Sequence, residues 1–154
     1  MVASGLVPRC TRVVVPVDLR TDWTTALAGA GFDASSPTAW IAEGLLQYLT
    51  EDEKKRLLDT VHSRSAPGSR FAFDHMDTSA DDRESVAGTL EQIRSMGAEF
   101  VATAADPAGW LAAHSWTTAV DRVPELAVAY GRPLPDFMDP AAANATALCT
   151  AALS

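Results

Sequence analysis

The chain has few of the residues that build metal sites and disulfide frameworks. It contains three histidines and two cysteines, Cys10 and Cys149, which lie near opposite ends without a Cys-x-x-Cys pair or a histidine at ligand spacing. We therefore expect no metal site and no disulfide, and we interpret both cysteines as reduced, small residues of the core. A Gly-x-Ser-x-Gly motif is also absent, which argues against a serine hydrolase of the α/β type.

Positive charge and long apolar runs are also scarce. Twelve Lys and Arg face 20 Asp and Glu, a formal net charge of −8. Nucleic acids and anionic membranes require clustered positive charge, so we expect neither as a partner. Lys54, Lys55 and Arg56 follow three acidic residues, an arrangement typical of a solvated helix face. Because the sequence has no targeting signal and no apolar run of about twenty residues, it predicts a cytoplasmic protein.

Along its whole length, the chain alternates between segments with the apolar spacing of a β-strand and segments with the apolar spacing of an α-helix. Its 154 residues suit a single domain, residues 1–154. Strands separated by helices imply right-handed crossovers and a mainly parallel sheet, an α/β fold. A capping box at Thr50 and Glu53 opens one of the helices. Strands are expected at 11–17, 37–42, 70–76, 116–120 and 145–153, although the alanine content of the last segment would suit a helix equally well. Helices are expected after Asp22, after Thr50, and at 81–96, 107–114 and 124–130, with a Pro-containing link through Pro135 and Pro140.

Two apolar runs end on an acid. Asp18 follows the run at 13–17, and Glu43 follows Trp40-Ile41-Ala42. The carboxyl ends of parallel strands are where open α/β folds bind ligands, so these acids predict a small-molecule site. The alternative is that they only cap the next turn or helix. Asp74, His75 and Asp77 suggest a metal or acid/base cluster, but neighbours on a strand alternate faces, and we favour ordinary loop roles.

Several motifs in a fixed order resemble one family. The chain is similar to the S-adenosyl-L-methionine-dependent methyltransferases of the leucine carboxyl methyltransferase type, in particular their mycobacterial and actinobacterial branch. The resemblance implies a Rossmann-like class I methyltransferase sheet with strand order 3-2-1-4-5-7-6. The motifs that carry it are Pro16-Val17-Asp18-Leu19-Arg20, Pro37-Thr38-Ala39-Trp40-Ile41-Ala42-Glu43-Gly44-Leu45-Leu46-Gln47-Tyr48-Leu49, Ser65-Ala66-Pro67-Gly68, Trp110-Leu111-Ala112-Ala113-His114 and Ala129-Tyr130-Gly131-Arg132-Pro133.

The resemblance also assigns roles within a cofactor site. It implies that the carboxylate of Asp18 accepts the adenine amino group of S-adenosyl-L-methionine, and that the backbone at Leu19 reads the ring edge. It places Glu43 near the methionine end of this cofactor. The implied reaction is O-methyl transfer to a carboxylate or hydroxyl of a small molecule. No catalytic base is identified, because methyl transfer depends mainly on alignment of the reacting groups.

The sequence departs from the family at its start. Relatives begin with two strands and a Gly-rich loop that have no counterpart here, since Gly29-Ala30-Gly31 follows a helix and not a strand. The chain therefore resembles the C-terminal half of a methyltransferase. We expect open sheet edges, weak cofactor binding, and self-association or an N-terminal partner chain at such an edge. The alternatives are a catalytically inactive α/β remnant or interaction module that pairs through this edge, and an unrelated nucleotide-binding α/β protein.

Overall fold

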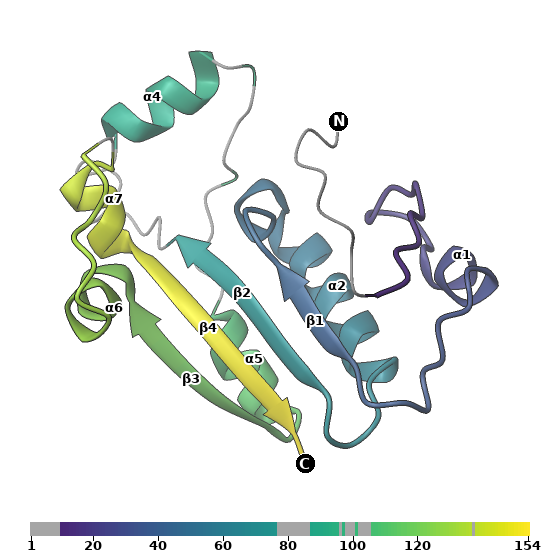
Figure 1. Ribbon diagram of the computed structural model, residues 1–154. Coiled ribbons are helices and arrows are strands. Elements are labelled where there is room, and N and C mark those ends of the chain that lie inside the picture. Colours follow the sequence, from purple (N-terminus) through teal and green to yellow (C-terminus); the bar gives the residue numbers. More distant parts are fainter. Residues whose placement is uncertain (1–9, 77–86, 96, 98–100, 102–105, 137) are drawn as a thin grey trace. The chain divides into compact units, whose positions relative to one another are not determined.

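The computed structural model describes residues 10–76, 87–95, 97, 101, 106–136 and 138–154. The chain divides into two compact units, Met1–Asp33 and Ala34–Ser154. Figure 1 shows the elements with the labels used from here on.

The first unit contains one described helix, α1 (Thr24–Gly29). The carboxylate of Asp22 accepts the backbone N–H of Thr24 at 2.9 Å, so the expected helix start is confirmed. The strand expected at 11–17 is wrong, because these residues have no regular secondary structure, and Val13 and Val14 are exposed. A β-branched run forms a strand only when another strand satisfies its backbone N–H and C=O groups. No described residue pairs with this run in a sheet.

The second unit holds a four-stranded sheet in the order β1-β2-β4-β3. The strands are β1 (Ala39–Ala42), β2 (Arg70–Met76), β3 (Trp116–Arg122) and β4 (Thr146–Leu153). The order agrees with the last four strands of the expected methyltransferase sheet. β1 and β2 pair in parallel, whereas β4 is antiparallel to both β2 and β3.

The α/β class is confirmed. The expectation of a mostly parallel sheet is not matched, because only the pair of β1 and β2 is parallel among the described strands. Three of its strands share a direction, and β4 alone runs against them among the described strands. The sheet is mixed because β4 lies between β2 and β3 and pairs with both of them in the antiparallel direction. The expected strands at 37–42, 70–76, 116–120 and 145–153 are confirmed, with ends that differ from the prediction by at most two residues.

The longest helix begins where the sequence predicts. In α2 (Glu51–Ser63) the hydroxyl of Thr50 accepts the Glu53 N–H at 3.3 Å, and the Glu53 carboxylate accepts the Thr50 N–H at 2.8 Å. This is the predicted capping box. One part of the expectation is wrong, because Lys54 is buried on the apolar face of α2, while Lys55 and Arg56 are exposed.

The remaining helices are short. They are η1 (Leu46–Tyr48), α4 (Ala87–Ser95), α5 (Pro107–Ala113), α6 (Val123–Ala129) and α7 (Pro140–Ala145). Residues 81–86 and 96 of the helix expected at 81–96 lie outside the described residues. The link expected through Pro140 is in fact α7, in which the Asp139 carboxylate accepts the N–H groups of Ala141 and Ala142 at 2.8 and 3.0 Å. Asp followed by Pro is a favourable helix start, because it combines an N-cap with a preset first residue.

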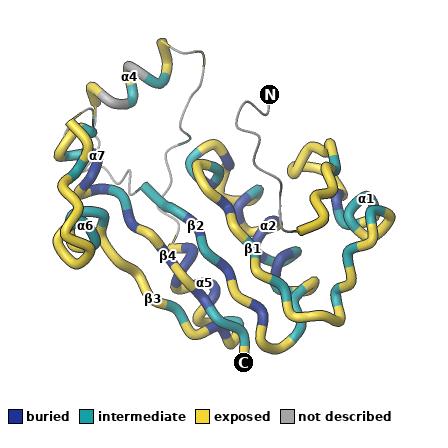
Figure 2. The backbone as a smooth tube through the Cα atoms, viewed as in Figure 1, coloured by how far each residue is buried: buried dark blue, intermediate teal, exposed yellow. Residues whose placement is uncertain are grey.

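The two faces of the sheet differ in burial. On one face Phe71, Phe73, Cys149 and Ala151 are buried. Figure 1 shows α2 and α5 behind this face, and the Trp40 indole of β1 donates to the hydroxyl of Ser65, just beyond α2, at 2.9 Å. Figure 2 shows that exposed and intermediate residues alternate with these along the strands. They belong to the opposite face, on which Ile41 is 77% exposed and Leu148 is 42% exposed.

Candidate functional site

The carboxyl ends of β1 and β2 bring two acids together. The parallel register pairs Ala42 with Phe73, so Glu43, which follows β1, lies close to Asp74, the fifth residue of β2. A pocket of about 240 Å³ opens here. Its lining is mostly apolar and consists of Ile41, Ala42, Glu43, Ala72, Phe73, Asp74, Leu148, Cys149 and Thr150. Two carboxylates beside an apolar surface suit a ligand with a cationic group on an apolar body.

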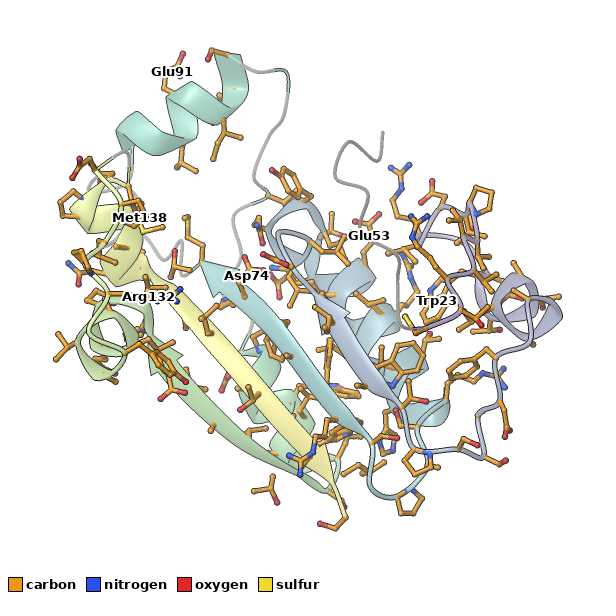
Figure 3. All side chains as sticks on the ribbon, in the orientation of Figure 1. Trp23, Glu53, Asp74, Glu91, Arg132 and Met138 are labelled. Atoms are coloured by element: carbon orange, nitrogen blue, oxygen red, sulfur yellow. The ribbon has the colours of Figure 1, made fainter. Side chains whose placement is uncertain are left out.

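Asp74 fixes the turn that follows Glu43. Its carboxylate accepts the backbone N–H of Gly44 at 2.5 Å and the side-chain amide of Gln47 at 3.4 Å. Gly44 has a φ of 61°, a left-handed conformation that glycine adopts at little cost. Figure 3 shows Asp74 near the carboxyl end of β2. Sequence reasoning assigned Asp74 an ordinary loop role and missed this contact, since a partner 30 positions away leaves no local signal.

Asp18 and Leu19 lie in the first unit, in a turn in which the Thr21 N–H donates to the Asp18 carbonyl at 3.0 Å. The Arg20 guanidinium contacts the Asp18 carboxylate at 2.7 and 2.9 Å. These hydrogen bonds, together with the backbone N–H of Arg20, lower the pKa of Asp18 to about 2. Its oxygens are thus engaged by a cation of its own unit, and Leu19 is exposed. Glu43 belongs to the other unit, and the surroundings of Asp18 and of Glu43 are therefore described separately.

Asp74 and His75 do not form the metal or acid/base cluster that was considered for Asp74, His75 and Asp77. Asp74 pairs with Leu148 and His75 with Ala147, so their side chains point to opposite faces. Asp77 lies outside the described residues. Throughout the described part of the chain, no group of three or more His, Cys, Asp or Glu side chains could hold a metal ion. None of the described helices has the length and apolar character needed to cross a membrane.

His62 and His114 pack against tryptophan side chains. The Trp116 indole N–H donates to Nδ1 of His62 at 3.2 Å, which ties β3 to α2. The Trp110 ring stacks on the His114 ring with centroids 3.8 Å apart. This aromatic cluster lies on the covered face of the sheet and holds α5 against α2.

The cysteines differ from each other. Cys149 is buried as expected, and burial, followed by the charge of Asp106, raises the pKa of its thiol to about 11. Cys10 is exposed, so its interpretation as a core residue is wrong. The run that follows it forms no strand.

Comparison with known proteins agrees with this architecture. Over residues 1–62 the chain matches the family of leucine carboxyl methyltransferase. A candidate S-adenosyl-L-methionine-dependent methyltransferase of Streptomyces coelicolor is 44% identical over 128 residues, which are 83% of this chain and 44% of that protein. A protein of the same description from Mycolicibacterium smegmatis is 41% identical over 147 residues, or 89% of this chain and 48% of that protein. The chain spans about half the length of the curated relatives it matches.

Solved structures give the same picture of the fold. A crystal structure of a candidate methyltransferase from Thermobifida fusca matches with a TM-score of 0.61 at 15% identity, and covers 90% of this chain and 52% of that one. A DUF574 family protein from Streptomyces avermitilis matches with a TM-score of 0.58 at 12% identity. The second unit therefore has the α/β sheet of methyltransferase structures. The resemblance to S-adenosyl-L-methionine-dependent methyltransferases of the leucine carboxyl methyltransferase type is confirmed by the family match and these relatives.

Proposed function

We propose that this chain supplies one part of an S-adenosyl-L-methionine-dependent methyltransferase site, with Glu43 beside the methionine end of the cofactor. The observation that carries the proposal is that Glu43, which follows β1, and Asp74 of the neighbouring parallel strand β2 both line one apolar pocket. Carboxylates favour a nearby cation, and the sulfonium and amino groups of this cofactor are cationic. When bound, the cofactor supplies an electrophilic methyl group.

The dimensions of the pocket support a partial site. Its volume of about 240 Å³ is below the roughly 300–1,000 Å³ typical of small-molecule sites. We expect it to take only one end of the cofactor. In the proposal the adenine end belongs to Asp18 and Leu19, and Arg20 must then release or share the Asp18 carboxylate. Because the pocket is small, we expect weak binding by the chain alone.

The proposed reaction is O-methyl transfer to a carboxylate or hydroxyl of a small molecule. The residues of this chain would orient the cofactor and would not transfer a proton. Glu43 offers a negative charge to the cation, and Asp74 holds the Gly44 turn so that the acid stays at the edge of the sheet. Such positioning is the main requirement of methyl transfer.

A titration of the full chain with S-adenosyl-L-methionine, followed by backbone amide NMR shifts, tests the proposal. We expect shifts at Glu43, Gly44 and Ala42 at millimolar concentrations, and weaker shifts with S-adenosylhomocysteine, which lacks the sulfonium charge. Glu43→Gln should weaken binding about tenfold or more, because a charged hydrogen bond is lost. Glu91→Gln on α4, outside the pocket lining, is the matched control. Absence of shifts around Glu43 would contradict the proposal, and submicromolar binding would contradict the partial site.

A second function is favoured by the edge of the sheet. β1 pairs with β2 on one side, and none of the described residues pairs with its other side. An unpaired strand edge is a template for another chain, as in an interaction module without catalysis. Measurement of the solution mass separates the two functions. A stable self-associated species that shows no shifts with the cofactor would favour the interaction module.

A further inference from the structure

One hydrogen bond between side chains joins the end of α2 to the start of β3. The indole N–H of Trp116 donates to Nδ1 of His62, with 3.2 Å between the two nitrogens. Trp116 is only 2% exposed, and the bond is partly buried. An indole nitrogen can only donate, so Nδ1 of His62 must offer its lone pair, and the proton of the neutral ring lies on Nε2. The bond therefore exists only while Nδ1 of His62 carries no proton.

A second histidine nearby has the opposite arrangement. Nδ1 of His114, the residue after α5, lies 2.8 Å from the carbonyl oxygen of Trp110. A carbonyl oxygen only accepts, so this Nδ1 carries the proton, and a further proton would enter at Nε2 and leave the bond intact. The His114 ring also stacks on the Trp110 ring with centroids 3.8 Å apart, an arrangement that is compatible with a positive charge. A proton therefore breaks the hydrogen bond of His62 but preserves that of His114.

The His62 and His114 rings lie beside each other, with centroids 5.6 Å apart. Among the described residues, neither ring forms an ion pair. The charged residues closest in sequence to the cluster on its three elements are Asp59 and Arg64 for α2, Asp106 for α5, and Asp121 and Arg122 for β3. Asp59 binds the Lys55 ammonium at 2.8 Å, and Asp106 caps the start of α5. The titratable side chain that the described contacts place against His62 is therefore His114.

The contact with His62 involves α5 as well as β3. The ring of Trp110 on α5 meets the His62 ring edge to face, with centroids 6.4 Å apart. Two residues, His114 and Ser115, separate α5 from β3. Ser115 has a φ of 67°, a left-handed conformation that is unfavourable for a residue other than glycine. β3 is also an edge strand, which among the described strands pairs with β4 alone. α5 and β3 can therefore shift away from α2 together without breaking a pair in the middle of the sheet.

We propose that His62 and Trp116 form a proton-operated latch that holds α5 and β3 against α2. When the pH falls through the range in which histidine side chains titrate, roughly pH 8 to 5, a proton enters at Nδ1 of His62. Two N–H groups then point at each other, and the indole of Trp116 is left as a buried donor without an acceptor, which is unfavourable. The contact opens, and α5 and β3 loosen. Neither ring lines the pocket beside Glu43, so the latch is independent of the proposed cofactor site.

Indole and imidazole resonances of the full chain test the latch without any cofactor. NMR spectra between about pH 7.5 and 5 follow the ring nitrogens of His62 and the indole N–H groups, with Trp116→Phe assigning the Trp116 signal. We expect the Trp116 indole proton to move upfield, as loss of its hydrogen bond requires, in step with protonation of His62. The indole of Trp40 donates to the Ser65 hydroxyl at 2.9 Å, a bond without a titrating partner, and is the internal control. Its signal should stay in place.

His62→Asn separates the proton from the contact. The Asn amide oxygen can occupy the place of Nδ1 and accept the Trp116 indole N–H, but it takes up no proton. At about pH 5.5 we expect the backbone amides of α5 and β3 to exchange at least about fivefold faster in wild type than in His62→Asn, and at about pH 7.5 we expect no such difference. His114→Asn is the matched control, because its amide N–H can still donate to the Trp110 carbonyl, and it should keep the pH response of Trp116.

Three outcomes would overturn the latch. One is a Trp116 signal that stays in place while His62 becomes protonated, or a His62 ring that takes up no proton down to about pH 5. Another is a Trp40 signal that shifts together with that of Trp116, which would indicate unfolding of the chain as a whole. The third is a pH response that survives in His62→Asn or disappears in His114→Asn. The wild-type titration decides the first two cases even if neither variant folds.

Discussion

At the scale of single residues, Lys54 is the least expected feature. Its side chain is only 2% exposed, and its ammonium lies 3.7 Å from the exposed carboxylate of Glu51. Burial lowers the pKa of Lys54, and the charge of Glu51 opposes this only in part. A buried ammonium with one partly solvated partner is a cost to the native state. Lys54 therefore destabilises the fold at neutral pH.

Lys54→Met should raise the free energy of unfolding at pH 7 by about 1 kcal/mol or more, since an apolar side chain of similar length removes the desolvation cost. Lys55→Met is the control, because Lys55 is 63% exposed and should change stability by less than about 0.5 kcal/mol. Urea unfolding measures both. A decrease in stability of Lys54→Met would show that its ammonium is better compensated than the contacts indicate.

The lowered pKa of Lys54 also predicts how the free energy of unfolding depends on pH. In the alkaline range, between the pKa of the folded chain and the ordinary value of 10.5, the unfolded chain holds a proton that the native chain has released. Stability therefore rises with pH in that window, as linkage requires. The advantage of Lys54→Met should shrink between pH 7 and pH 10 in the same urea experiment. An advantage that is constant across this range would contradict the assignment.

The two thiols predict a difference in reactivity. The pKa of Cys149 is raised to about 11, so almost no thiolate forms at pH 8, and its side chain is buried. Cys10 is exposed. In native protein at pH 8 we expect iodoacetamide to modify Cys10 only, with Cys149 reacting after denaturation. Mass spectrometry of the native chain and of Cys10→Ser checks this, and rapid modification of native Cys10→Ser would be inconsistent with a buried Cys149.

At the scale of elements, Asp74 links β2 to the turn after β1. Asp74→Asn removes the charge from its hydrogen bond to Gly44, and charged hydrogen bonds contribute about 1.5–3 kcal/mol against about 1 kcal/mol for neutral ones. We expect the Gly44 amide to exchange at least about fivefold faster. Asp121→Asn, on an exposed strand position, should leave it unchanged. Equal rates in wild type and Asp74→Asn would show that the turn is fixed by other contacts.

The elements also show how far sequence reasoning reaches. β2 and the capping box of α2 were predictable because both depend on neighbours in sequence, Phe71 with Phe73 and Thr50 with Glu53. The first expected strand failed, because the run at 11–17 needs a partner strand that local pattern cannot supply. The contact between Asp74 and Gly44 was hidden for the same reason, since it depends on the parallel register of β1 and β2. Glu43 was found because it ends a strand, and its role stays a prediction.

At the scale of the whole molecule, all four described strands lie in Ala34–Ser154. This unit contains the covered face of the sheet and the aromatic cluster between α2, α5 and β3. We therefore expect a chain that begins at Ala34 to unfold cooperatively. Circular dichroism on heating checks this, with the full chain as the control. A broad transition without a folded baseline would show that residues 1–33 are required for the sheet.

The position of β4 has a consequence for biosynthesis. β4 is the last of the four strands to leave the ribosome, yet it lies between β2 and β3. Until it emerges, β2 and β3 present facing edges with nothing between them, and the two halves of the sheet cannot join. The sheet therefore cannot form in full during synthesis until β4 has been translated, and the nascent chain must be kept from pairing elsewhere until then.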